Sequence, residues 1–204
     1  MTEVARPMED DIRYVRSMAE GGANAPLLGG RFMVWWGLLL TAAYLTHHLA
    51  LKGTIGNGPA VFGLLWAAFA ISGPVGHCIL IRTMPAKAGG GSAGNRASRV
   101  VWIAAAMAIA SMVGGSTALS MQGSGPAAFD WIVPVAFAAY ACALISMGAL
   151  ARNNAVLAAG GGAVAMVGLF TALILTPDRY LVAAAGVFLT VLVPGLLLFR
   201  AEPR

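Results

Sequence analysis

Three histidines are the residues of this 204-residue chain whose chemistry most readily suggests a specific function. His47 and His48 lie next to each other, late in one apolar run, and His77 lies late in the following run. An imidazole side chain can bind a metal ion, relay a proton or change its charge near neutral pH. The sequence therefore gives His47, His48 and His77 as candidate binding residues.

The two runs place these histidines at different depths if each forms a helix that crosses a membrane. Successive helices cross in opposite directions, so His47 and His48 lie near the outer face and His77 near the inner face. At about 1.5 Å per residue, the two levels differ by roughly 15–20 Å. One zinc ion or haem held by His48 and His77 of one chain does not fit that separation. We predict no metal and no cofactor.

Two interpretations of the His47–His48 pair remain open. The first is an outer-leaflet ligand site or pH-sensitive contact, because histidine titrates near neutral pH. The second is a structural pair at the membrane interface that forms hydrogen bonds with loop groups. The sequence alone favours the structural pair.

The stretch from Ser72 to Cys78, which reads Ser-Gly-Pro-Val-Gly-His-Cys, is the second candidate site. Pro74 removes a backbone donor and the glycines remove bulk, so a kink or an opening of the helix is expected there. Freed carbonyls together with Ser72, His77 and Cys78 could coordinate a solute, as broken helices do in transporters. The alternative is a kinked helix whose polar groups are satisfied by its neighbours.

The overall composition is that of a membrane protein. Hydrophobic residues make up 59% of the chain and charged residues 10%, and the mean hydropathy is +0.79. The formal net charge is +5, but the basic residues are scattered at the ends of apolar runs, which argues against a nucleic-acid partner. Cys78 and Cys142 lie inside apolar runs and are expected to pack as small hydrophobic residues.

The charged residues divide the chain into six uncharged runs of about 20 to 30 residues, and a helix needs about 20 apolar residues to cross a bilayer. Helices are expected because unpaired backbone groups in lipid are costly. We predict an all-α integral membrane protein, a six-helix transmembrane bundle over residues 31–200. The predicted spans are about 32–51, 59–81, 100–119, 131–151, 155–176 and 180–199.

The distribution of lysine and arginine predicts the orientation. Eleven basic residues lie on one side of the predicted membrane and two, Lys52 and Arg179, on the other. Cytoplasmic loops are enriched in Lys and Arg. Both termini, including a tail of residues 201–204, are therefore predicted to be cytoplasmic. A bias toward alanine and glycine is typical of high-GC bacterial genes and suggests a bacterial inner membrane.

Two cytoplasmic segments accompany the spans. Residues 1–30 form a lead in which a short amphipathic helix is expected from residue 10 or 11 to about residue 20. This helix could bind a partner or rest on the inner face of the bundle, and the second interpretation is favoured. Residues 83–99 contain a glycine-rich stretch and are predicted to be a flexible linker.

Two further patterns concern how the helices assemble. The spans can be grouped into three helix hairpins, with arginines after each even-numbered span and similar openings at Arg31 and Arg99. Either an internal repeat or the positive-inside rule alone explains this. Small residues around Gly160–Gly162 would let helices approach closely, within the chain or in a homo-oligomer.

The function is predicted mainly from what the spans do not contain. No Asp, Glu, Lys or Arg lies within a predicted span, which disfavours ion-driven pumps and antiporters. No acid–base or nucleophile constellation indicates an enzyme. We expect a non-enzymatic accessory or regulatory membrane subunit, in contact with the lipid bilayer and a membrane or cytoplasmic partner. The alternative is a small channel or transporter for an uncharged or weakly polar solute.

Overall fold

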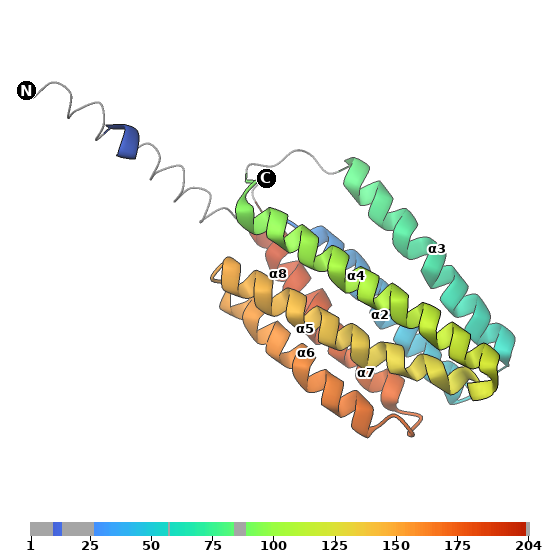
Figure 1. The fold of residues 1–204 in the computed structure, drawn as a ribbon. Helices are drawn as coiled ribbons and strands as arrows, with labels where there is room; N and C mark the ends of the chain where they lie inside the picture. Colours follow the sequence, from blue (N-terminus) through green and yellow to red (C-terminus); the bar gives the residue numbers. More distant parts are fainter. Residues whose placement is uncertain (1–9, 14–26, 57, 84–88, 203–204) are drawn as a thin grey trace, which may run out of the picture.

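The computed structural model describes residues 10–13, 27–56, 58–83 and 89–202, and all regular secondary structure in these residues is helical (Figure 1). The helices are α2 (Gly30–Leu51), α3 (Pro59–Thr83), α4 (Ala93–Leu119), α5 (Ile132–Leu150), α6 (Asn154–Ala172), α7 (Arg179–Val187) and α8 (Val193–Ala201). Short segments join them: the π-helical η1 (Ser120–Ser124) and η3 (Phe188–Leu192) and the 3₁₀-helical η2 (Pro126–Trp131). The predicted all-helical class is confirmed.

Five helices in the described part of the chain are long and apolar enough to cross a membrane. They are Pro59–Thr83, Ala93–Ser124, Pro126–Leu150, Asn154–Ala172 and Arg179–Ala201. The 22-residue α2 is not among them, because residues such as Trp35, Trp36, His47 and His48 lower its hydropathy. Several of its polar side chains face other helices instead of the surroundings, and both Tyr44 and His48 are buried. A sixth span at α2 remains a prediction.

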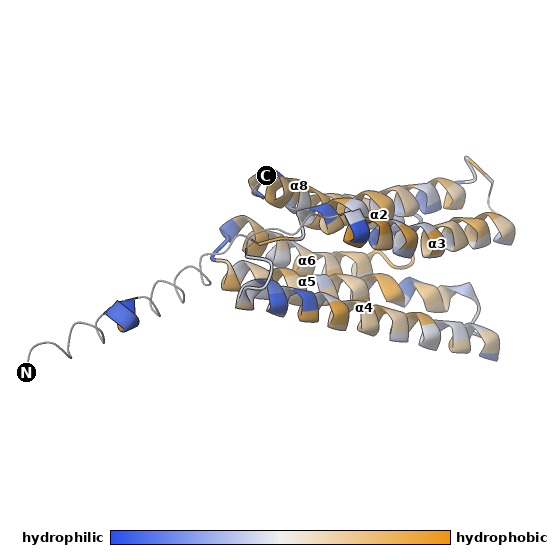
Figure 2. Ribbon diagram, turned by 90° about the horizontal axis from the view of Figure 1, so that it is seen from above, coloured by the Kyte–Doolittle hydropathy of each residue, from blue (hydrophilic) through white to orange (hydrophobic). Residues whose placement is uncertain are grey.

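The helices lie in two rows (Figure 2). One row holds α3, α2 and the continuous α7–η3–α8 rod, and the other holds α4, α5 and α6. Packing of α6 against α7 and η3 joins the rows, and Phe137, Leu144, Phe170 and Val187 are buried where they meet. Only 6% of the most apolar stretch of α3 is buried, compared with 56% in the α7–α8 rod. The helix α3 therefore lies at the edge of the bundle and is held mainly by α2.

Glycines bring α2 into close contact with η3 and α8. A Cβ atom added to Gly37 would lie 2.8 Å from the Cα of Leu192, and one added to Gly195 would lie 2.7 Å from the Cβ of Met33. Gly160, in the small-residue stretch of α6, similarly faces Ile145 of α5. Gly161 has open space beside it. The stretch thus serves packing within the chain through Gly160, while a homo-oligomer remains a prediction.

The start of α4 differs most from the sequence-based expectation. The helix α4 begins at Ala93, seven residues before the predicted span and inside the predicted 83–99 linker. It starts there because the Ser92 side chain accepts a hydrogen bond from the Asn95 N–H and caps the helix. In the lead, residues 10–13 are helical, whereas residues 14–20 of the predicted amphipathic helix lie outside the described residues.

Pro74 and Pro194 affect their helices differently. The helix α3 remains helical through Pro74, so its backbone does not open there. Pro194 lies just after the π-helical η3, in which the N–H of Val193 bonds to the carbonyl of Phe188. A proline cannot donate to the carbonyl four residues earlier and clashes with it, and the wider π turn relieves that clash. Pro194 is therefore accommodated by a π turn.

Candidate functional site

The candidate histidines lie at opposite ends of the α2–α3 pair. His47 and His48 occupy the last turns of α2, and His77 lies near the end of α3, beside Phe32 at the start of α2. His48 is buried, and its Nδ1 lies 3.1 Å from the carbonyl oxygen of Pro177 in the α6–α7 loop. The structure therefore does not bring His48 and His77 together. We name these two ends of the bundle the His47 end and the His77 end.

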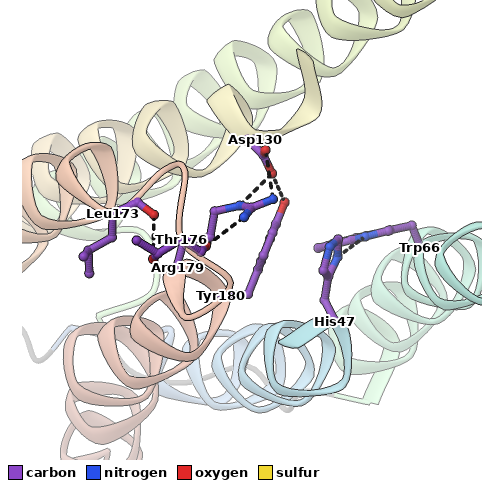
Figure 3. A network of polar contacts seen from close by, with 7 residues as sticks. All are labelled: His47, Trp66, Asp130, Leu173, Thr176, Arg179 and Tyr180. Carbon is purple, nitrogen blue, oxygen red and sulfur yellow. Dashed lines mark hydrogen bonds and ion pairs between the residues drawn. The ribbon is translucent and has the colours of Figure 1, made fainter. Parts of the chain in front are cut away.

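At the His47 end, the imidazole of His47 lies between two aromatic side chains (Figure 3). The indole N–H of Trp66 donates to its Nδ1 over 3.0 Å, and the ring of Tyr180 stacks on it at 3.7 Å between centroids. An indole N–H can only donate, so Nδ1 must be unprotonated and neutral His47 carries its hydrogen on Nε2. Neither ring nitrogen of this tautomer is free to bind a metal ion.

An ion pair adjoins this histidine. The Nε and Nη2 of Arg179 donate to the two carboxylate oxygens of Asp130 over 3.3 and 3.2 Å, and the Tyr180 hydroxyl donates to the same carboxylate over 2.6 Å. Only 13% of the Asp130 side chain and 17% of the Arg179 side chain are exposed. Charge-assisted bonds of this fork geometry are strong and directional. The pair therefore fastens η2, which precedes α5, to the start of α7.

Local structure orients the arginine. The chain turns between α6 and α7, where the Thr176 hydroxyl donates to the carbonyl of Leu173. The Arg179 Nη1 then donates to the carbonyl of Thr176 over 2.8 Å, which leaves Nε and Nη2 directed at Asp130 (Figure 3). Three of the arginine donors are thus used within the chain, so the guanidinium has a single defined position.

A second ion pair, which is exposed, lies at the same end of the bundle. The Lys52 ammonium lies 3.0 Å from the Asp178 carboxylate, with 44% and 54% of the two side chains exposed. Exposed pairs of this kind contribute about 0–1 kcal/mol. Together with the contact between His48 and Pro177, this pair connects the end of α2 to the α6–α7 loop.

At the His77 end, the Ser72–Cys78 stretch is used for helix packing. The Trp36 indole N–H donates to the Nδ1 of His77 over 3.1 Å, and the Trp35 N–H donates to the carbonyl of Gly73 over 3.1 Å. Ser72 donates to the carbonyl of Ala68 within α3, and Cys78 is exposed. Of the three predicted side chains, His77 thus turns toward α2, while Ser72 bonds within its own helix.

A polar junction at the His77 end joins the last part of the lead to two other elements. The carboxylate of Glu202 accepts the N–H groups of Gly29 and Gly30, over 3.2 and 3.0 Å. The Asn95 side-chain oxygen, on α4, accepts the N–H of Leu28 over 2.8 Å. Glu202 and Asn95 are both buried. The start of α2 is therefore fixed by side chains from α4 and from the end of the described chain.

Sequence reasoning missed Asp130, Arg179, Tyr180 and Trp66. The two charges were interpreted as topology signals because each lies at the edge of an apolar run. Their opposite signs on the same predicted membrane side were the signal that could have paired them. The partners of Tyr180 and Trp66 depend on which helices are neighbours, and the sequence pattern does not give that.

The long apolar helices, with paired charges at their ends, define a polytopic α-helical membrane protein in contact with lipid. Within the described residues, no group of three or more His, Cys, Asp or Glu side chains is arranged to hold a metal ion. Comparison of the chain with family models, curated proteins and solved structures gave no significant match.

Proposed function

We propose that the chain is a six-span protein of a bacterial inner membrane, with both termini in the cytoplasm. The helix α2 supplies the sixth span: its 22 residues would extend about 33 Å, enough to cross a hydrocarbon core of about 30 Å. Its position between α3 and the α7–α8 rod supports this assignment, because its polar side chains then face protein. The His77 end, which carries most of the basic residues, is the cytoplasmic end in this proposal.

We further propose that it acts as a non-enzymatic accessory or regulatory subunit of another membrane protein. The observation that supports this is the junction of Leu28, Gly29 and Gly30 with Asn95 and Glu202. A partner that bound the lead would act on the start of α2, and through these bonds on α4 and the end of α8. The junction thus provides a mechanical connection between the cytoplasmic lead and the bundle.

The test compares the full-length chain with a variant that lacks residues 1–25, both purified in mild detergent after crosslinking in native membranes. A protein recovered in stoichiometric amount with the full chain and lost with the deletion is the expected result. Glu202→Ala should weaken recovery of the same protein, because it frees the N–H groups of Gly29 and Gly30. Arg200→Gln, at an exposed position two residues away, is the matched control and should leave recovery unchanged.

The same Glu202→Ala variant should be less stable by about 1–2 kcal/mol, the usual effect of removing a side chain that caps a helix N-terminus. Denaturation in mixed SDS micelles, followed by circular dichroism, measures this. Unchanged stability would show that the junction does not hold the start of α2.

Solute flux is the result that would contradict the accessory proposal. The purified protein is reconstituted in liposomes beside a His77→Ala variant, and uptake of small uncharged solutes is measured. The accessory proposal predicts equal, background flux for both proteins. Flux that is present in the parent and vanishes in the variant would show instead a channel or transporter that uses the Ser72–Cys78 stretch.

A further inference from the structure

The two ends of the bundle differ in how their charges are paired. At the His47 end, Lys52 and Arg179 each form an ion pair, with Asp178 and Asp130 respectively. At the His77 end, none of the arginines that the structure describes forms an ion pair or donates a side-chain hydrogen bond within the described part of the chain. These six arginines are Arg31, Arg82, Arg96, Arg99, Arg152 and Arg200.

The His77 end therefore carries a large excess of positive charge. From residue 27 to residue 202 the sequence has three acidic residues, and only Glu202 lies at this end. Its buried carboxylate accepts the N–H groups of Gly29 and Gly30. The helices α2, α4 and α6 all begin at this end, and their first turns contain no acidic residue. Because a helix N-terminus has a partial positive charge, these helices add to the positive potential.

Three of the arginines lie beside the polar junction of this end. Arg31 directly follows Gly30 of the junction, and Arg96 directly follows Asn95, whose side chain accepts the N–H of Leu28. Arg99 lies nearly one turn further along α4, whose start is hydrophilic (Figure 2). The bonds of the junction thus hold together the two helix starts that carry these arginines.

The guanidinium of Arg31 has a defined position but no anionic partner among the described residues. Its Cζ lies 5.2 Å from the centroid of the Phe199 ring on α8. Its Nε is buried and has no hydrogen-bond partner, which is unfavourable for an N–H donor. Arg96 and Arg99 are exposed. An anion at this place would compensate three cations that the chain itself leaves unpaired.

We propose that Arg31, Arg96 and Arg99 bind the phosphate groups of anionic phospholipids at the membrane surface. The planar fork of arginine N–H donors matches a phosphate group, and anionic lipids are attracted to basic residues next to a membrane-spanning helix. The surface of α4 directly beyond these arginines is apolar, with Val100 and Ile103 65% and 59% exposed. Such a surface accommodates acyl chains, which favours a lipid over free phosphate. This inference goes beyond the accessory role and does not depend on it.

Native mass spectrometry of the full-length protein in a neutral detergent tests the proposal, because it counts bound lipids during a titration. Phosphatidylglycerol, which is anionic, should bind more tightly than zwitterionic phosphatidylcholine by a factor of at least about ten. Arg31→Gln and Arg96→Gln should each weaken phosphatidylglycerol binding about five-fold, the usual contribution of one basic residue near an anionic surface. Neither variant should change the binding of phosphatidylcholine.

Arg82→Gln is the matched control. It removes the same charge from the same end, but from α3, which packs mainly against α2. It should weaken phosphatidylglycerol binding by less than about two-fold, because salt screens charges that lie farther away. Equal effects of Arg82→Gln and Arg96→Gln would show a general attraction to positive charge and would overturn the site.

Two further results would overturn the proposal. One is equal binding of the two lipids to the parent protein. The other is displacement of phosphatidylglycerol by an excess of inorganic phosphate, which would assign the site to free phosphate instead of a lipid. If Arg31→Gln does not fold, Arg96→Gln and Arg99→Gln decide, since both change exposed positions. Unchanged phosphatidylglycerol binding in both of these variants would also exclude the site.

Discussion

Asp130→Asn should lower the free energy of unfolding by about 3 kcal/mol. Removing one partner of a buried ion pair leaves the other charge uncompensated, which costs about 3–5 kcal/mol. We expect the lower end of this range because both side chains are slightly exposed and the asparagine retains one oxygen for the Tyr180 hydroxyl. The guanidinium of Arg179 would lose the opposite charge and the bond from its Nη2, and it would keep the bonds from Nε to the retained oxygen and from Nη1 to the carbonyl of Thr176. SDS denaturation in mixed micelles, followed by circular dichroism, measures the change.

The matched control is Asp178→Asn, which breaks the exposed pair with Lys52 at the same end of the bundle. It should change the stability by about 0–1 kcal/mol, because solvent screens that pair. Adding Arg179→Gln to Asp130→Asn should recover part of the loss, since neither charge then remains unpaired. Equal effects of the two Asp→Asn variants, or additive effects of the Asp130 and Arg179 changes, would show that the ion pair does not hold η2 to α7.

Charge spacing alone predicts most of the fold because the membrane imposes the same rule on every span. Each of the six uncharged runs contains one long helix or helical rod of the structure, with ends shifted by a few residues. The largest shift is at α4, where Ser92 and Asn95 form a local cap inside a glycine-rich stretch. The sequence-based prediction treated the glycines there as a linker and gave the cap no weight.

The helix α2 is the one predicted span that is not among the five apolar helices. Its run of 20 uncharged residues meets the length of a span, yet its histidines and tryptophans make it less apolar than the other helices. Those same side chains make its contacts: Trp35 and Trp36 with α3, and His47 and His48 with α3 and the α6–α7 loop. The hydropathy of this run is low because these side chains contact neighbouring helices. An average hydropathy does not show which side chains face a neighbour.

Part of the candidate site can likewise be predicted from the sequence, and part of it cannot. A Phe-x3-Trp-x10-His pattern is visible in the sequence of both α2 and α3, and antiparallel packing of consecutive spans would have paired His47 with Trp66 and His77 with Trp36. The contact between His47 and Tyr180, in contrast, joins residues 133 positions apart. It depends on α7 packing beside α2, and in a bundle of similar apolar helices the order of neighbours is set by side-chain fit.

Gly37→Ala is the second change with a large expected effect, because it tests that fit at the contact between α2 and η3. The new Cβ would lie 2.8 Å from both the backbone nitrogen and the Cα of Leu192, and a backbone cannot rotate away as a side chain can. Overpacking costs about 1–3 kcal/mol, and alanine returns about 0.5–1 kcal/mol through its better helix propensity. We therefore expect a net loss of about 1–2 kcal/mol in SDS denaturation.

The control is Gly115→Ala in α4, where nothing lies within 4 Å of the added Cβ. The only effect there is the better helix propensity of alanine. This variant should therefore be as stable as the parent or up to about 1 kcal/mol more stable. The opposite signs of the two changes are the diagnostic result, because a general effect of alanine on membrane helices would give them the same sign. If Gly37→Ala stabilises the protein as Gly115→Ala does, α2 is not held against the α7–α8 rod at this distance, and the stacking of His47 on Tyr180 would lose its structural basis.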